Sequence, residues 1–112
     1  MRDKPLHVRA DKKTRRGKVE VAAKIDLHDM TAAQAFPALR RAVIRAYNRN
    51  HVCLLVVTGK GLRGQGVLRR SLPEWLQHPE IRPVISEFAP AHLRHGGSGA
   101  WYVFLKTPKS KS

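Results

Sequence analysis

An aspartate and a histidine two residues apart, Asp26 and His28, are the side chains of this sequence best suited to acid–base chemistry. Alternate residues of a strand share a face, so the carboxylate can contact the imidazole, fix its tautomer and raise its pKa. A histidine held in this way can exchange a proton with a substrate or contact a phosphate. The alternative is that Asp26 caps the next helix and that His28 merely ends a strand.

Two glycine-rich segments are candidates for binding an anion. Thr58, Gly59, Lys60 and Gly61 follow an apolar run, and glycines there would let backbone amides approach a phosphate beside the charge of Lys60. The alternative is a flexible loop that requires positive φ angles.

The second segment covers residues 95–99, where Gly96, Gly97 and Gly99 would form another anion-binding nest with His95 and Ser98 as donors. The alternative is a tight turn before a core strand. A metal site at His92 and His95 would need a third ligand, and the sequence offers no clear one nearby.

Alternating strand and helix signals surround these segments. Thr31 and Gln34 have the spacing of a capping box, which predicts a helix that ends at residues 48–50, and Pro37 is expected to kink it or loosen its start. A second helix is predicted at about residues 67–77, interrupted by Pro73. Strands are predicted at residues 24–27, 53–57, 84–88 and 100–105, and the second of these, a continuous apolar run, is expected to be buried on both faces, as in a parallel sheet.

This order predicts a small two-layer α/β domain with a mixed, mainly parallel sheet. Right-handed crossovers would make the first three strands parallel neighbours, with their carboxyl ends at one edge. An antiparallel fourth strand would bring residues 95–99 to the same edge. We therefore expect three separated segments to converge where open α/β sheets bind their ligands.

The composition favours a polyanionic partner. The chain has 112 residues, enough for one domain, with 22 Lys and Arg against 8 Asp and Glu, a formal charge of +14. Nucleic acid is the expected partner, ahead of an anionic membrane, because no long basic helix carries an apolar stripe. The polar face of the first predicted helix is basic and carries Arg40, Arg41, Arg45 and Arg49.

The ends of the chain are expected to be basic and loose. Residues 1–22 are interpreted as a flexible basic arm and residues 107–112 as a basic tail, around a domain at residues 23–106. The one cysteine, Cys53, excludes an internal disulfide and is expected to be buried. No apolar run is long enough to span a membrane, so a cytoplasmic location is expected.

Taken together, these motifs resemble the Smr (small MutS-related) domain over residues 23–106. They are Ile25-Asp26-Leu27-His28-Asp29-Met30-Thr31, Thr58-Gly59-Lys60-Gly61, Gly66-Val67-Leu68-Arg69 and His95-Gly96-Gly97-Ser98-Gly99-Ala100. The resemblance implies a fold similar to the C-terminal domain of translation initiation factor three. It also implies nucleic-acid binding and, as in several members, endonuclease activity on DNA or RNA.

The same resemblance implies roles for individual residues. His28 would be the acid–base group or would polarise the scissile phosphate, and Asp26 would orient it or bind a divalent cation such as Mg²⁺. Lys60 and the amides of Gly59 and Gly61 would hold the phosphate. The nucleic-acid backbone would be followed by the basic arm and by Arg63, Arg69 and Arg70.

Two positions depart from the family pattern: Pro37 lies in the first predicted helix, and Asp29 stands where the family usually has glycine. A carboxylate there would repel phosphate or help to hold a divalent ion. The leading hypothesis is a nuclease of Smr type, and the alternative is a non-catalytic nucleic-acid-binding or ribosome-associated module. A small-anion or nucleotide-binding domain is the third class.

Overall fold

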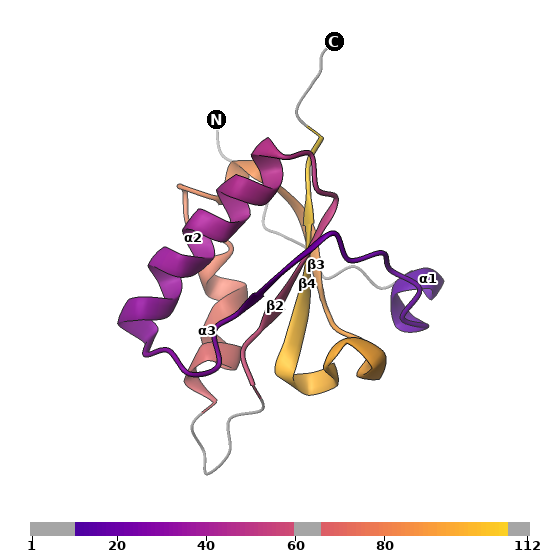
Figure 1. The fold of residues 1–112 in the computed structure, drawn as a ribbon, viewed down its shortest axis with the longest axis horizontal. Helices are drawn as coiled ribbons and strands as arrows, with labels where there is room; N and C mark the ends of the chain where they lie inside the picture. Colours follow the sequence, from indigo (N-terminus) through magenta and orange to yellow (C-terminus); the bar gives the residue numbers. More distant parts are fainter. Residues whose placement is uncertain (1–10, 60–65, 108–112) are drawn as a thin grey trace.

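The fold is built on one four-stranded mixed sheet in the order β1-β2-β4-β3 (Figure 1). This computed structural model describes residues 11–59 and 66–107. The strands are β1 (Ala23–Asp26), β2 (Cys53–Val57), β3 (Ile85–Pro90) and β4 (Ala100–Leu105), and the helices are α1 (Lys12–Arg15), α2 (Ala32–Asn48) and α3 (Val67–Trp75). Short 3₁₀ turns cover Arg82–Val84, Leu93–His95 and Gly97–Gly99.

The strand order corrects part of the predicted topology. β1 pairs with β2 in parallel, whereas β4 lies between β2 and β3 and is antiparallel to both. The mixed sheet is confirmed, but β3 is not a neighbour of β1 or β2, and the pairing is not mainly parallel. The reason is burial: β4 is apolar on both faces and belongs in the interior of the sheet, while β3 has exposed positions that suit an edge.

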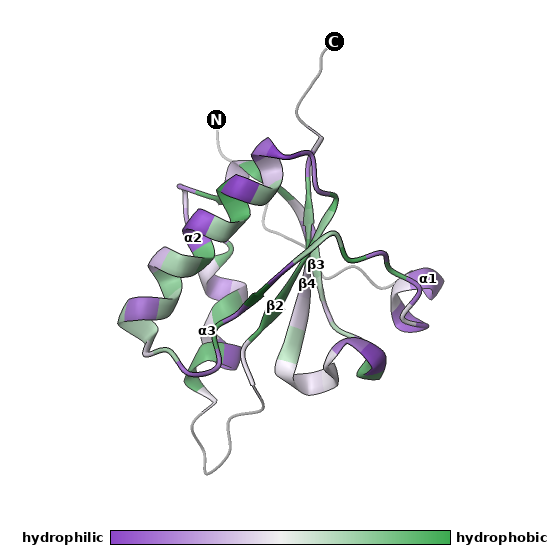
Figure 2. Cartoon of the chain, viewed as in Figure 1, coloured by the Kyte–Doolittle hydropathy of each residue, from purple (hydrophilic) through white to green (hydrophobic). Residues whose placement is uncertain are grey.

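The sheet has a different cover on each face. On one face α2 and α3 pack against Leu54, Val56 and Val103, which form the larger core. On the other face Cys53 and Tyr102 belong to a smaller cluster. Figure 2 shows apolar residues along β2 and on the inner side of α2. The predicted burial of residues 53–57 on both faces is confirmed, because each face of β2 has its own core.

The smaller core is covered by the N-terminal segment, not by a helical layer. Val19 and Val21 pack against it, and Asp11 caps the start of α1, where its Oδ1 accepts the N–H of Thr14 at 2.8 Å. Residues 11–22 were expected to belong to a flexible arm, and in the structure they form this helix and an extended segment on the sheet. Residues 1–10 and 108–112 lie outside the described residues, and the division into arms and domain stays a prediction.

Local signals set both ends of α2. The capping box is confirmed: Thr31 Oγ1 accepts the N–H of Gln34 at 3.2 Å, and Gln34 Oε1 accepts the N–H of Thr31 at 3.0 Å. After the helix, Asn50 has a φ of 61° and His51 N–H donates to the Ala46 carbonyl at 2.9 Å, as in a Schellman motif.

The prolines do not interrupt the helices. α2 is continuous through Pro37 and α3 continues past Pro73 to Trp75, so the predicted interruption at Pro73 is wrong. Pro37 lies near the start of α2, where it removes one intrahelical hydrogen bond from a helix that is well capped and packed. Within the described ranges no helix is long and apolar enough to cross a membrane.

Candidate functional site

Three segments meet at the edge of the sheet where β1 and β2 end. The N–H of Leu27 donates to the Val57 carbonyl at 2.7 Å, and the N–H groups of Thr58 and Gly59 donate to the Gly99 carbonyl at 2.9 and 3.0 Å. In Figure 1 this is the lower edge of the sheet. The predicted convergence is confirmed despite the different strand order, because antiparallel β4 begins beside the end of β2.

Asp26 and His28 form the predicted pair on β1 and just beyond it. Asp26 Oδ1 lies 2.6 Å from His28 Nδ1 and also accepts the backbone N–H of His28 at 3.0 Å. An ionised carboxylate only accepts hydrogen bonds, so Nδ1 carries a proton and Nε2 is the nitrogen left to exchange one. Both side chains are about half exposed, at 46% and 49%, which leaves the pair open to a large substrate.

The pair shifts both pKa values toward the charged forms. The hydrogen bond to the Asp26 carboxylate, and then the negative charges of Asp26 and Asp29, raise the pKa of His28 above its ordinary value. The backbone N–H of His28, and then its ring, hold the pKa of Asp26 below the usual range. An imidazolium at His28 is therefore favoured, with Asp26 ionised beside it.

Asp29 lies at the other ring nitrogen of His28. Its Oδ1 is 3.2 Å from His28 Nε2, and its side chain is 87% exposed. A phosphate that approaches Nε2 must therefore displace this carboxylate. The displacement requires no repacking, because Asp29 is held in solvent and not in a core.

Gly59 brings the backbone after β2 directly against His28. Its φ is +78°, a conformation that favours glycine, and a Cβ at this position would lie 3.2 Å from His28 Cβ. Its N–H donates to the Gly99 carbonyl and so does not face a phosphate, which corrects one predicted role. Thr58 is buried, and its Oγ1 lies 3.2 Å from the Gly59 carbonyl oxygen and 3.4 Å from that of Gly99, so its hydroxyl fixes the turn.

The segment at residues 95–99 has the geometry of a closed turn. The N–H of Gly97 donates to the His92 carbonyl at 3.0 Å, and the N–H of Gly99 donates to the Gly96 carbonyl at 3.1 Å. These amides are satisfied within the turn, so the geometry favours the tight-turn alternative over an anion site. Ser98 is exposed and remains the candidate contact of this segment.

His95 is anchored by a buried tyrosine. Its Nδ1 lies 2.6 Å from the Tyr102 hydroxyl, which also accepts the N–H of His92 at 3.2 Å. Burial first, and then the electrostatic influence of the neighbouring Arg94 and His92, lowers the pKa of His95. This bond is not predictable from the sequence, since Tyr102 lies in an apolar strand and its hydroxyl has no motif around it.

The remaining candidates flank the site. Arg69 and Arg70 lie in the first turn of α3; Arg70 is exposed, and Arg69 is half-buried, with its Nε without a hydrogen-bond partner among the described residues. Lys60, Gly61 and Arg63 lie outside the described residues. The part of the chain that is described holds no cluster of three His, Cys, Asp or Glu side chains that could bind a metal.

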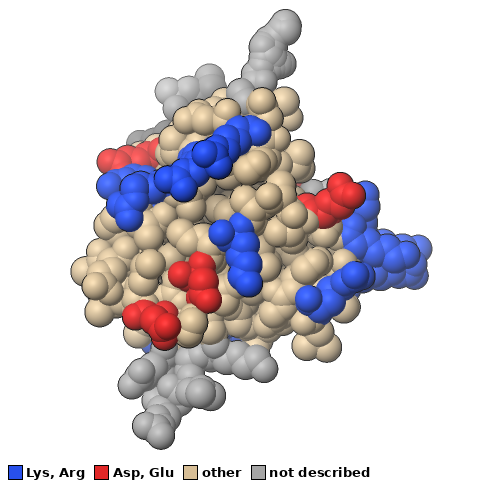
Figure 3. Space-filling model, in the orientation of Figure 1, with Lys and Arg blue, Asp and Glu red and all other residues tan. Residues whose placement is uncertain are grey.

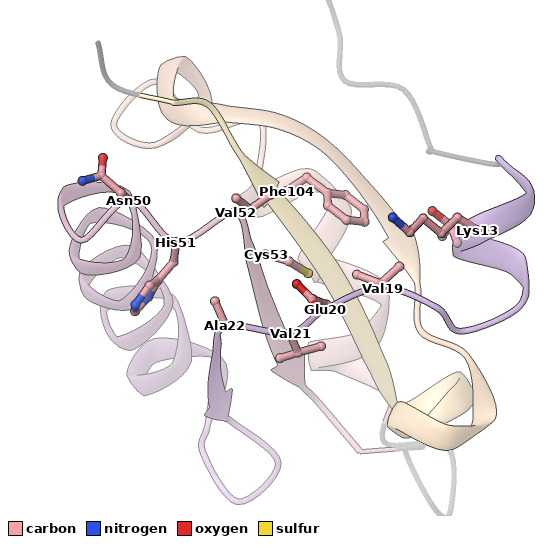
Figure 4. Close-up of a pocket in the computed structure, with 11 residues that line it drawn as sticks. Lys13, Val19, Glu20, Val21, Ala22, Asn50, His51, Val52, Cys53 and Phe104 are labelled. Atoms are coloured by element: carbon pink, nitrogen blue, oxygen red, sulfur yellow. The ribbon is translucent and has the colours of Figure 1, made fainter. Parts of the chain in front are cut away.

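One hollow in the described part of the chain lies away from this edge, over the smaller core; Figure 4 shows residues that line it. Its volume is about 610 Å³, and its lining includes Val19, Val21, Cys53 and Phe104. Cys53 is a buried free thiol, as predicted. The walls combine apolar side chains with single polar groups and contain no acid–base pair like that of Asp26 and His28.

Comparison with known proteins agrees with this geometry. The chain is 29% identical to the ribosome rescue factor SmrB of Haemophilus ducreyi over 115 residues, covering 96% of this chain and 61% of that protein. It is 37% identical to an uncharacterized protein of Treponema pallidum over 87 residues, covering 75% of this chain and 41% of that one. The chain thus spans less than two thirds of the length of either relative.

Two solved structures share the fold. The crystal structure of the Smr domain of Thermus thermophilus MutS2 matches with a TM-score of 0.66 at 28% identity, over 76% of this chain and 99% of that one. Escherichia coli YdaL, a stand-alone small MutS-related protein, matches in fold with a TM-score of 0.72 at 24% identity, over 85% of this chain and 72% of that one. The Smr domain family model matches residues 25–106, which contain the whole edge described above, and the chain belongs to this family.

Proposed function

We propose that this protein is a nucleic-acid-binding endonuclease of Smr type that cleaves or nicks phosphodiester bonds in RNA or DNA. The observation that carries the proposal is the Asp26–His28 pair, with Nδ1 held by the carboxylate at 2.6 Å and Nε2 directed away from it. Support comes from the family membership and from the formal charge of +14, which suits a polyanionic substrate.

In this mechanism His28 moves the proton. Water or a neighbouring hydroxyl attacks the phosphorus and releases its proton to solvent, the bond to the leaving oxygen breaks, and protonated Nε2 donates its proton to that oxygen. A proton from solvent then restores the imidazolium. Asp26 keeps Nδ1 protonated and stabilises the imidazolium, which the raised pKa of His28 already favours. General acid catalysis of this kind contributes about 10²–10⁴-fold to a rate.

Groups beside this pair would bind the phosphate and balance its negative charge. Because the amides of Gly59 and Gly97 donate within the protein, the phosphate contacts fall to Lys60, Gly61 and Ser98. Arg63, Arg69 and Arg70, with the basic N-terminal segment, would follow the backbone on either side.

The setting of the reaction is part of the proposal. The relative from Haemophilus ducreyi is a ribosome rescue factor, which supports RNA near or on the ribosome as the substrate and a cytoplasmic location. The edge of the sheet is open and its acid–base pair is half exposed, which suits a long polymer better than a small molecule.

The test compares substrates and a single histidine variant. The protein is incubated with end-labelled single-stranded RNA, duplex RNA, supercoiled plasmid and branched DNA, each with Mg²⁺ or with EDTA. Cleavage of one polymer that falls at least 100-fold in His28→Ala supports the proposal. His78→Ala is the matched control, since His78 is an exposed histidine in the turn after α3, away from the Asp26–His28 pair. Equal cleavage by His28→Ala and by the wild type would refute it.

A second function, nucleic-acid binding without cleavage, is favoured by the position of Asp29. Its carboxylate lies 3.2 Å from His28 Nε2, where it repels an incoming phosphate. If the wild type binds polynucleotides without cutting them, Asp29→Gly, which restores the residue usual in the family, is the variant to assay. Cleavage gained by Asp29→Gly would assign the inactivity to this one carboxylate.

A further inference from the structure

The outer face of α2 carries a row of like charges that the site does not use. Arg41, Arg45 and Arg49 follow one another at four-residue intervals and are all exposed. They line an open hollow of about 600 Å³, and the other lining residues are Arg40, Ile44, Asn48 and Glu80. Figure 3 shows Lys and Arg as a continuous band across α2. We call these three residues the arginine row.

This row is not explained by the stability of the helix. α2 contains no Asp or Glu, and among the described residues none of the three arginines makes an ion pair. Cations four residues apart on a helix repel one another and destabilise it. The helix dipole favours cations only in the last turn, so it does not account for Arg41.

The neighbouring arginine shows the difference. Arg40 pairs with Glu80, with Nη1 and Oε1 2.9 Å apart, which ties α2 to the loop after α3. The arginine row has no such partner in the described part of the chain. An array of guanidinium groups without carboxylate partners is suited to bind phosphates, which it can contact in a bidentate manner.

We infer that the arginine row is a second binding surface, which holds the phosphate backbone of the nucleic acid at a distance from the cleaved bond. This inference rests on the proposed nucleic-acid binding, and it adds the path that the polymer takes along α2. α2 starts four residues after His28, and the row lies about 14–26 Å farther along the helix axis at 1.5 Å per residue. That distance corresponds to about four to eight nucleotides at 3.4 Å per nucleotide of one duplex strand.

The test measures the salt dependence of binding in a His28→Ala background, so that no substrate is cut. The variant Arg41→Gln/Arg45→Gln/Arg49→Gln should lower the slope of log K against log salt by about 2–3, since each lost phosphate contact removes about 0.7–0.9. The control Lys106→Gln removes one charge from an exposed position outside both the row and the basic N-terminal segment. It should lower the slope by much less than the roughly 0.7–0.9 expected for Arg45→Gln alone.

Two further measurements separate charge from folding. Arg41→Lys/Arg45→Lys/Arg49→Lys keeps the charge and should keep most of the slope. The glutamine variant should melt at the wild-type temperature or slightly above it, because like-charge repulsion is removed. With oligonucleotides of increasing length, wild-type affinity should rise up to about eight nucleotides, and the glutamine variant should lack that rise.

Several results would overturn the inference. They are an unchanged slope in the glutamine variant, a loss of slope in Lys106→Gln equal to that in Arg45→Gln, or displacement of RNA by polyglutamate as effectively as by unlabelled RNA. The last result would assign the row to an acidic protein. The nuclease proposal fails separately if the wild type cleaves no substrate while the glutamine variant still lowers the slope of log K against log salt. No binding to any polynucleotide would refute both.

Discussion

Replacing Gly59 by alanine should disturb the site more than it disturbs the fold. Gly59 has a φ of +78°, and its new Cβ would lie 3.2 Å from His28 Cβ, a few tenths of an ångström inside ordinary contact. A residue other than glycine in the left-handed region costs about 1–2 kcal/mol. We expect that loss in the free energy of unfolding, and a fall of roughly 5–10 °C in melting temperature for a domain of this size.

The effect on cleavage should exceed what this loss explains. At a temperature where the variant is folded, a stability loss alone leaves the rate unchanged. A shift of His28 by a few tenths of an ångström misaligns Nε2, and since a displacement of 1 Å can cost about 10²-fold, we expect cleavage to fall by about tenfold.

The control uses the same backbone conformation at the other end of the sheet. Asn50 has a φ of 61° at the end of α2 and does not contact the site. Asn50→Ala should lose about 1 kcal/mol of stability and keep its cleavage rate. Urea unfolding and cleavage of one labelled substrate are measured for both variants. If both variants lose cleavage in the same proportion to stability, or if Gly59→Ala is as stable as the wild type, the reasoning is wrong.

Three further predictions concern the groups around the site. The pKa of His28 is raised, so this group stabilises the fold below pH 6.5, its ordinary pKa, and the stabilisation is lost as pH rises through the raised pKa. The pKa of Asp26 is lowered, so this group stabilises the fold above pH 3.8, its ordinary pKa, and the stabilisation is lost as pH falls through the lowered pKa. Asp26→Asn should therefore lower the free energy of unfolding most between pH 3.8 and pH 6.5. It should also lower the pKa of His28 in an NMR titration. Thr31→Ala should cost about 1 kcal/mol in urea unfolding, through loss of the helix cap. Gly17→Ala would place a Cβ 2.5 Å from His92 Cγ, and should speed hydrogen exchange of the turn that follows His92.

The sequence predicts those elements whose signals are local. The bounds of β2 and β4 match their apolar runs, and the capping box at Thr31 places the start of α2. In each case a few neighbouring residues decide the structure: burial on both faces of a strand, or a side chain that accepts the first amide of a helix. The pairing of Asp26 with His28 belongs to this class, because alternate residues share a face whatever the sheet order is.

Features that depend on distant partners were not predictable in the same way. The place of β4 between β2 and β3 depends on which strand can be buried on both faces, a comparison among all four strands. The N-terminal segment was expected to be loose because it is highly charged. Its alternating Val19 and Val21 nevertheless cover the smaller core, and a charged segment with two apolar residues on one face is sufficient for that.

The same distinction explains why the structure agrees with one part of the predicted site and differs from another. The acid–base pair was predictable from spacing, whereas the direction of an amide depends on the φ and ψ angles of a turn that spacing does not fix. Gly59 was expected to present its N–H to a phosphate, yet its positive φ and the nearby carbonyl of Gly99 turn that N–H inward. In the proposed function the phosphate charge is therefore balanced by side chains, with His28 at this edge and Arg69 and Arg70 beside it. Asp29, 3.2 Å from His28 Nε2, is consequently the group whose displacement decides whether the pair reaches a substrate.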